Sequence, residues 1–298
     1  MSVNAALTAR FQAARPQLGA LAYRMLGSID DAEDAVQEAW LRLSRIDAPG
    51  AAAIANLDAW LTTVVARICL NTLRARRARP REELVAQMPD PVVDPVGEFD
   101  PEHRAMLADA VGLALFVVLD TLSPAERLAF VLHDVFAVPF DQIAPILDRS
   151  PEATRKLASR ARRRIHDANA VPDVDVRAQR EVVDAFFAAG RAGDFDRLVS
   201  LLHPDVLLRG DFGRGQVRSE QGASRVAKLA RGYAVPERQV RAATVNGAAG
   251  AVIFVGDRAT AIMGFVVREG RIAAIDVLAD PVRLARIDLS AVGGRPFR

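Results

Sequence analysis

The fold is decided over residues 122–166, which read LSPAERLAFVLHDVFAVPFDQIAPILDRSPEATRKLASRARRRIH. Ser123 is followed by a proline and, three positions on, by Glu126, a pattern that predicts a capped helix start with a capping box. A short apolar helix is expected over about 140–147. Asp148 then opens a tight turn into a second Ser-Pro helix start. The stretch therefore predicts helices separated by a turn, ahead of a longer last helix.

This last helix is expected over about 151–166, with Leu157, Ala161 and Ile165 facing a core. Polar and basic side chains occupy its other positions: Thr154, Arg155, Lys156, Ser159, Arg160, Arg162 and Arg163. Such a helix after a tight turn suits the DNA major groove, where its N-terminal side chains reach bases and its arginines bind phosphates. Pro145 removes a backbone donor from the helix before the turn and can bend it. A solvated basic helix is the alternative, but turn, capping and basicity together favour DNA binding.

The residues before this stretch also predict helices. Apolar side chains recur at helical spacing over 7–25, Gly27 suits the end of that helix, and Ser28 or Asp30 can cap the next one. A third helix begins near Asn56, with an apolar stripe of Leu57, Leu61, Val64 and Ile68. Its polar stripe consists of Thr63, Arg67, Asn71 and Arg74. A solvated face is possible there, but the mixture of arginine, Asn and Thr favours nucleic acid.

Charge is distributed unevenly along the 298 residues. The net charge is only +2, from 39 basic and 37 acidic residues. Residues 82–148 nevertheless carry thirteen acidic and two basic side chains, while 1–81 and 149–172 are each net basic. Such asymmetry indicates polyanion binding better than the total does.

Composition excludes several classes of protein. The single cysteine, Cys69, rules out an internal disulfide framework and a cysteine-based zinc site. No apolar run is long enough to span a membrane, and the N-terminus lacks a signal-peptide pattern. We therefore expect a cytoplasmic protein with no membrane partner and no metal or other cofactor.

Two proline-containing stretches divide the chain. Residues 88–95, Met-Pro-Asp-Pro-Val-Val-Asp-Pro, predict an extended linker, since each proline restricts the residue before it. A second boundary is expected near 171–173. The predicted domains are 1–81, an acidic Pro-rich linker over 82–104, a helix-turn-helix module over 105–170 and a third module over 175–298.

The first two modules resemble the extracytoplasmic-function (ECF) sigma factors of the sigma-70 family. Residues 23–27 (YRMLG), 31–42 (DAEDAVQEAWLR) and 59–67 (AWLTTVVAR) are similar to region 2. Residues 122–127 (LSPAER) through 158–162 (ASRAR) are similar to region 4. The resemblance implies an initiation factor that binds core RNA polymerase and directs recognition of the −10 and −35 promoter elements.

The resemblance also implies which residues act. Contact with the clamp helices of the largest polymerase subunit falls to Asp34, Gln37, Glu38 and Leu41. Capture of unstacked −10 bases falls to Asn56, Asp58, Thr63, Arg67, Asn71 and Arg74. Reading of the −35 duplex falls to Thr154, Arg155, Lys156, Ser159, Arg160 and Arg163, and region 4 would also meet the polymerase flap. The acidic linker would pass near the polymerase active site and repel free DNA.

The third module is expected to be an α+β domain, with two helices leading into a strand near 206 and later strands over 251–255, 261–267 and 271–278. It resembles the SnoaL-like group of the NTF2-like cone fold. A sigma factor with such a domain resembles the SigJ type, which implies regulation in cis and no dedicated anti-sigma factor. The family's linker motif is matched by Pro89, Asp90, Pro91, Val92 and Val93, onto which we expect the third module to pack. Two further motifs of this type depart from the pattern, at 210–216 and 279–284.

Two other functions remain open on the sequence. A one-component helix-turn-helix regulator could sense a small molecule through residues 175–298. An enzyme could use His203, Asp211 and Asp276 as acid or base groups. We favour structural roles for these three residues, because fold alone does not give function, and we expect no catalytic residues.

Overall fold

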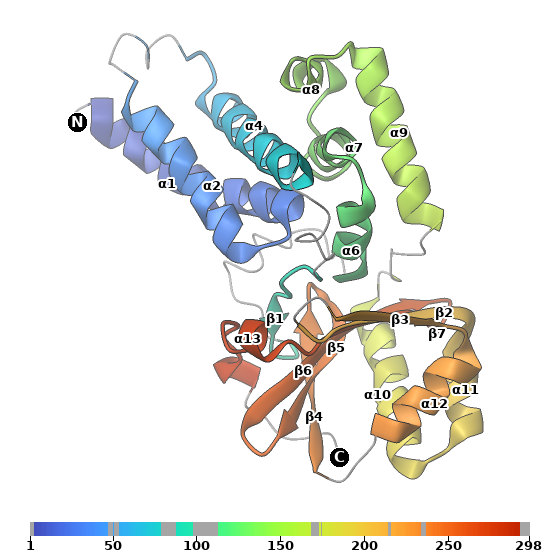
Figure 1. The fold of residues 1–298 in the computed structure, drawn as a ribbon. Coiled ribbons are helices and arrows are strands. Elements are labelled where there is room, and N and C mark those ends of the chain that lie inside the picture. The colour runs from blue at the N-terminus through green and yellow to red at the C-terminus, as the bar shows by residue number, and fades with distance from the viewer. Residues whose placement is uncertain are drawn as a thin grey trace. The chain divides into compact units, whose positions relative to one another are not determined.

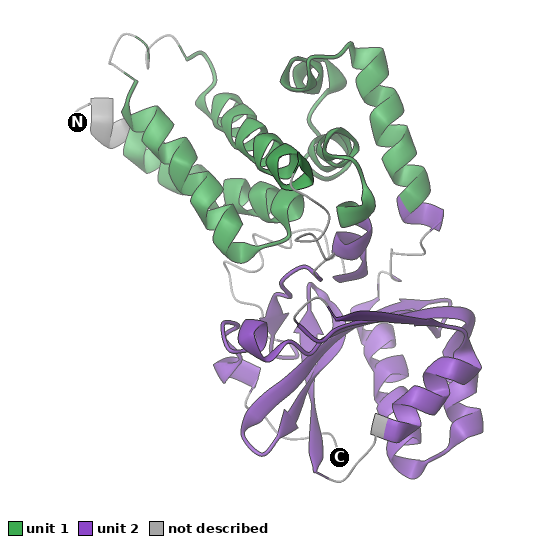
Figure 2. Ribbon diagram, in the orientation of Figure 1, with its two compact units in different colours: residues 1–84, 104–108, 119–164 green, residues 85–103, 109–118, 165–298 purple. Residues whose placement is uncertain are grey.

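The computed structural model describes residues 3–46, 50, 54–78, 88–97, 113–167, 173, 175–213, 216–233 and 237–292. It divides into two compact units (Figure 2). Unit 1 comprises Met1–Leu84, Arg104–Ala108 and Leu119–Arg164, and unit 2 comprises Val85–His103, Asp109–Val118 and Ile165–Arg298. The first helical module and most of the second thus fall in unit 1, and the described part of the linker clusters with the C-terminal domain. The predicted boundaries at 81/82 and 104/105 lie outside the described residues.

The first helical module contains α1 (Val3–Leu26), α2 (Ile29–Ser44) and α4 (Leu57–Ala78) (Figure 1). Gly27 ends α1 with a φ of 72°, and its N–H donates to the Tyr23 carbonyl at 2.8 Å. Ser28 caps α2, its hydroxyl accepting from the Asp31 N–H at 3.3 Å. Of the two caps expected from the sequence, Ser28 is therefore the one used.

The buried face of α4 differs from the expected stripe. Val64 and Ile68 are only half-buried, whereas Val65 and Cys69 are fully buried beyond Leu57 and Leu61. The physical reason is that α4 packs against α1, α2 and α7 at once, so its covered face is wider and turned from the simple stripe. Burial raises the pKa of the Cys69 thiol to about 12, which keeps it a neutral core residue.

The second helical module contains α7 (Pro124–Phe130), α8 (Phe140–Leu147) and α9 (Pro151–Asp167). A π-helical turn, Val131–Val135, continues α7. The capping box of Ser123 and Glu126 is present, as the sequence predicts. Asp148 closes α8 in the left-handed conformation with a φ of 54°, and α8 keeps its expected bounds with Pro145 inside it. A preceding helix, α6 (Leu113–Thr121), has its residues 113–118 in unit 2.

Unit 2 is built on a seven-stranded sheet in the order β1-β4-β5-β6-β7-β2-β3. The parallel pair is β2 with β7, and the other neighbours are antiparallel. The bounds of the strands are β1 (Val93–Asp94), β2 (Leu202–Asp211), β3 (Val217–Gln221), β4 (Arg238–Val245), β5 (Ala248–Val255), β6 (Arg258–Arg268) and β7 (Arg271–Leu278). The strand β1 comes from the linker, so the linker is part of this sheet.

Two apolar clusters lie on the sheet. One joins it to helices α10 (Val176–Ala192), α11 (Phe195–Leu201) and α12 (Ala223–Tyr233), which lie together beside the sheet in Figure 1. The other joins β4, β5 and β6 to side chains from the linker, the start of α6, α13 (Pro281–Leu284) and η2 (Ser290–Val292). The linker and the C-terminal segment therefore contribute to the domain's core.

The expected fold class is confirmed: helical modules are followed by an α+β domain. The three strands predicted over 251–278 lie within β5, β6 and β7. The sequence pattern does not predict β3, α12 or β4. Most residues of β3 are exposed, so the strand lacks the alternation of apolar and polar residues that would reveal it.

Candidate polymerase and nucleic-acid interface

The expected polymerase-binding residues form an outward face of α2. Asp34, Gln37 and Leu41 are exposed, and Leu41 keeps 39% of its surface accessible. Glu38 is somewhat less exposed and accepts from Nε of Arg42, one helical turn on, at 2.9 Å. Alanines and Leu43 face the core of the module from the other side of the helix. This face of α2 therefore presents two carboxylates, an amide and one exposed leucine.

The expected −10 residues lie along the start and one face of α4. Asn56 caps the helix, its Oδ1 accepting from the Ala59 N–H at 3.1 Å. Thr63 is half-buried, and its hydroxyl donates to the Ala59 carbonyl at 2.9 Å. Asp58 lies 3.7 Å from Arg10. The remaining members are exposed: Arg67, Asn71 and Arg74. The side chains of Arg67, Asn71 and Arg74 are thus accessible to a DNA strand. Those of Asn56 and Thr63 are hydrogen-bonded to the backbone of α4 itself.

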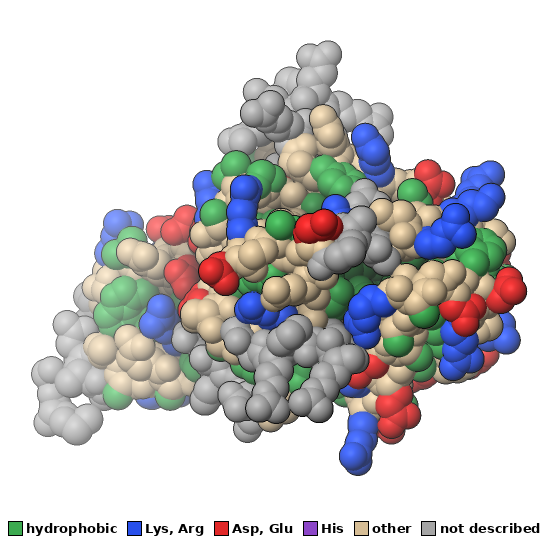
Figure 3. All heavy atoms as spheres, turned by 90° about the horizontal axis from the view of Figure 1, so that it is seen from below, with side chains coloured by type: hydrophobic (Ala, Val, Ile, Leu, Met, Phe, Trp, Pro, Cys, Tyr) green, Lys and Arg blue, Asp and Glu red, His purple; other side chains and the backbone are tan. Residues whose placement is uncertain are grey.

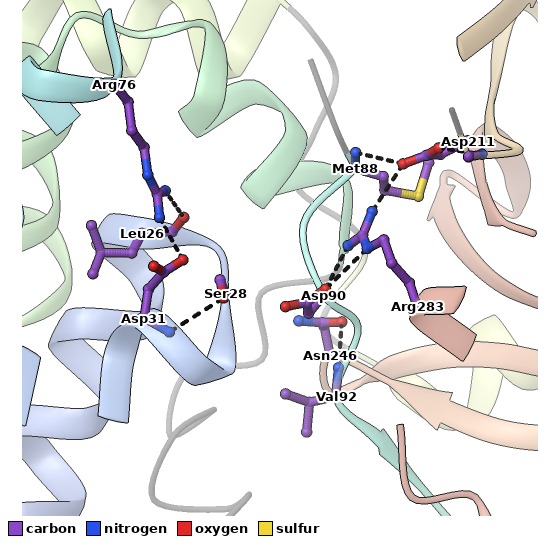
Figure 4. A network of polar contacts seen from close by, with 11 residues as sticks. Leu26, Ser28, Asp31, Arg76, Met88, Asp90, Val92, Asp211, Asn246 and Arg283 are labelled. Carbon is purple, nitrogen blue, oxygen red and sulfur yellow. Dashed lines mark hydrogen bonds and ion pairs between the residues drawn. The ribbon is translucent and has the colours of Figure 1, made fainter. Parts of the chain in front are cut away.

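Two arginines at the end of α4 serve contacts inside unit 1. Arg76 donates to the Leu26 carbonyl at 3.2 Å and pairs with Asp31, which joins the end of α1 to the start of α2 (Figure 4). Arg77 donates to the Leu122 carbonyl, just before α7. Two of the arginines at the end of α4 therefore make contacts within the protein, which the charge of this segment alone does not reveal.

The expected −35 residues lie on α9. Arg155, Lys156, Ser159, Arg160 and Arg163 are exposed. Thr154 does not share their face: it is fully buried, and its hydroxyl donates to the Ser150 carbonyl at 3.0 Å. A threonine in the first turn satisfies its hydroxyl locally in this way, so Thr154 leaves the DNA-facing set.

Acidic residues of the same module hold three arginines of α9. Glu126 lies 3.6 Å from Arg160 and 3.3 Å from Arg164, and Asp134 lies 2.7 Å from Arg162. Burial raises the pKa of Glu126, but hydrogen bonds from Ser123 and the two arginines outweigh it, and the pKa lies below its ordinary value. At Asp134 the effect of burial is larger than that of the neighbouring Arg162, so the pKa of this carboxyl is raised.

The two helical modules also contact each other through a buried arginine. Arg127 on α7 is 2% exposed, donates from Nε to the Arg24 carbonyl at 3.0 Å and pairs with Asp120. Arg24 in turn lies over the Phe136 ring, 5.4 Å from its centroid. No role for Arg127 follows from the sequence, because the carbonyl that it contacts belongs to a helix about a hundred residues earlier in the chain.

The linker is bound along the edge of the sheet in unit 2. Val93 and Asp94 pair with Val245 and Thr244 of β4. Asn246, which follows β4, donates its N–H to the Val92 carbonyl at 2.8 Å and accepts the Val92 N–H on Oδ1 at 3.2 Å. A side chain and a backbone group of one residue thus extend the ladder by one position.

An arginine and an aspartate complete the linker contacts (Figure 4). Arg283 of α13 lies 2.6 Å from Asp90 and 2.9 Å from Asp211. Asp211 also accepts the Met88 N–H at 3.1 Å. Asp211 lies in the stretch 210–216 and Arg283 in the stretch 279–284, so both stretches contact the linker directly.

The three residues considered for catalysis have structural partners. Asp276 is almost fully buried and forms a two-point pair with Arg209, at 2.6 and 3.0 Å. Burial raises its pKa, while Arg209 lowers it, and burial dominates. Asp211 binds the linker, and His203 Nδ1 accepts from the Asp205 N–H at 3.2 Å. Within the described ranges, no cluster of His, Cys, Asp or Glu is arranged to hold a metal ion.

Two further observations concern surface partners. None of the helices among the described residues is long and apolar enough to cross a bilayer.

On the face drawn in Figure 3, basic and acidic side chains are interspersed and do not gather by sign. That face therefore does not single out a polyanion partner.

Comparison with known proteins decides the family. A model of sigma-70 region 2 matches residues 10–79, and a model of sigma-70 region 4 matches residues 113–165. The ECF RNA polymerase sigma factor SigJ of Mycobacterium tuberculosis is 40% identical over 289 residues, covering 91% of each chain. The chain belongs to the ECF sigma factors. A probable ECF sigma factor of the same organism, SigI, is 35% identical over 99% of this chain and 100% of its own.

A solved structure extends this likeness to the fold of the sigma factor. The crystal structure of Mycobacterium tuberculosis SigJ covers 95% of this chain and 99% of its own, at 37% identity and a TM-score of 0.73. Sigma factors bind core RNA polymerase and promoter DNA and are not themselves enzymes. This membership supports the initiation-factor hypothesis over the one-component regulator.

Proposed function

We propose that this sigma factor uses three separate faces of unit 1. The outward face of α2, with Asp34, Gln37, Glu38 and Leu41, binds the clamp helices of the largest polymerase subunit. The exposed arginines of α4 follow the unstacked −10 strand, since a melted strand needs a cationic track. The exposed residues of α9 read the −35 duplex, and the module around them meets the flap. The observation that carries this proposal is the exposure of these side chains on capped, well-packed helices.

We further propose that the C-terminal domain regulates the factor in cis through the linker. The supporting contacts are the β1–β4 ladder, the two hydrogen bonds of Asn246 and the ion pairs of Arg283. A linker held in this way cannot at the same time lie extended in a polymerase channel. Release of residues 88–94 from the sheet would therefore accompany initiation. In this scheme the domain takes the place of a dedicated anti-sigma factor, and the protein works in the cytoplasm beside its polymerase.

Transcription in vitro tests the first proposal. Core polymerase with the full chain should initiate from a cognate promoter, and Glu38→Arg should abolish co-purification with core polymerase. Initiation that survives Glu38→Arg unchanged would contradict the α2 assignment.

The second proposal is tested with Arg283→Gln. This change removes the ion pairs of Arg283 with Asp90 of the linker and with Asp211, which accepts the Met88 N–H. Hydrogen exchange at the Met88 amide should therefore accelerate, and the rate of initiation should change. Arg258→Gln, an exposed arginine of β6, is the matched control and should alter neither. Faster exchange with no change in initiation would leave the linker contact structural and refute regulation through it.

A further inference from the structure

Four arginines of α9 are held in two chemically different ways. Three of them lie beside the carboxylates of Glu126 and Asp134. Arg155, in the first half of the helix, instead lies over the Phe140 ring, with Cζ 5.4 Å from the ring centroid. The difference matters because a carboxylate occupies the N–H donors of a guanidinium, whereas an aromatic face attracts its charge and leaves those donors unused.

The ring beneath Arg155 is itself fixed in place. Phe140 is the first residue of α8, and the His133 ring stacks on it with centroids 3.8 Å apart and planes 26° apart. His133 is oriented in turn by its Nδ1–H, which donates to the Val138 carbonyl at 3.1 Å. The three side chains come from the π-helical turn, α8 and α9, so the assembly spans the whole helix-turn-helix. All of it lies within unit 1.

We propose that Phe140 is a positioning residue for promoter recognition: its ring holds the Arg155 guanidinium in place with its donors free for the edge of a base in the −35 duplex. A side chain already restrained loses less rotamer freedom on binding. A planar guanidinium with free donors can meet two acceptors on one base, which in the major groove are guanine O6 and N7. The inference rests on the proposed function, because it takes α9 as the −35-reading helix.

The test is a measurement of base preference. Holoenzyme made from the full chain and core polymerase is incubated with promoter duplexes randomised over the −35 element, and the bound DNA is sequenced. Arg155→Ala should erase the preference at one position. Phe140→Leu and Phe140→Met, which keep an apolar side chain but remove the ring, should lower the preference at that same position about two- to fivefold. Phe140→Tyr, which keeps the ring, should restore it.

Several results would overturn the inference. They are an unchanged preference at the Arg155 position in both ring-less variants, an equal loss at all positions, or a Tyr variant no better than Leu. The double variant Arg155→Ala/Phe140→Leu should match Arg155→Ala alone, since the ring acts only through Arg155. A further loss of preference in the double variant would show that Phe140 acts elsewhere.

Failure of the inference is distinguishable from failure of the proposed function. If Arg155→Ala changes only the salt-dependent affinity and moves no base preference, Arg155 contacts phosphate and the positioning role falls, while α9 remains the DNA-binding helix. If Arg155→Ala, Lys156→Ala and Arg163→Ala all leave promoter binding unchanged in an intact holoenzyme, the −35 assignment of α9 itself is wrong, and the positioning role falls with it.

Discussion

Arg127 Nε donates to the carbonyl of Arg24 across the two helical modules at 3.0 Å. Arg24 lies in the last turn of α1, where carbonyls lack helical partners and attract positive charge. Arg77 makes the converse contact, reaching from α4 to the Leu122 carbonyl before α7. Each module thus gives an arginine to a main-chain carbonyl of the other.

The first prediction concerns Arg127. Replacing it by Ala creates a cavity at a fully buried position and removes the hydrogen bond to the Arg24 carbonyl, so the free energy of unfolding should fall by about 3 kcal/mol. Urea denaturation measures this. Arg149→Ala, at an exposed arginine of the same helical module, should change stability by less than about 0.5 kcal/mol. Equal effects of the two changes would refute a special role for the buried guanidinium.

A second prediction concerns pH. The pKa of Glu126 is lowered in the folded state, so its contribution to stability is complete above the ordinary glutamate pKa and disappears as pH falls through the folded value. The stability difference between the wild type and Glu126→Gln should therefore be largest near neutrality and shrink below about pH 4. Thermal unfolding followed from pH 7 to pH 3 checks this, and a difference that grew on acidification would contradict the assignment.

A third prediction separates the two roles of Asn246. Its φ of 50° is left-handed, and its side chain accepts the Val92 N–H. Asn246→Gly and Asn246→Ala both lose the side-chain acceptor, but Ala alone adds backbone strain at this left-handed position, so Ala should be less stable than Gly by about 1 kcal/mol. Thermal unfolding compares the pair. If Ala is the more stable of the two, the strain argument fails.

A fourth prediction concerns salt. Removing one phosphate-binding cation from a protein that holds single-stranded DNA makes the slope of log affinity against log salt shallower by about 0.7. Arg74→Gln should therefore reduce the salt dependence of holoenzyme binding to a −10 non-template oligonucleotide by about that amount. Arg258→Gln, exposed on β6, is the control and should leave the slope unchanged. A slope that stays the same in Arg74→Gln would remove Arg74 from the DNA track.

The sequence was most informative where structure is set locally. The Ser123 capping box, the bounds of α8 and the end of α1 at Gly27 all follow from side chains within a few residues of each other, and each is found. The strands β5 to β7 were also predictable, from apolar runs broken by turns. Prediction was weaker for α4, whose buried face depends on its packing against α1, α2, α7 and α8.

The candidate surfaces divide in the same way. By itself, the sequence determined which helices carry the basic and acidic side chains, because helical periodicity assigns residues to faces. Only the tertiary structure decided which of those side chains remain available. In the folded chain Thr154 is buried, and Arg76 and Arg77 donate hydrogen bonds to main-chain carbonyls. Arg155 lies over the Phe140 ring, and the linker pairs with β4. The physical reason is range: capping and periodicity act within one or two turns, whereas the partner of a charged side chain is whichever distant segment the fold brings to it.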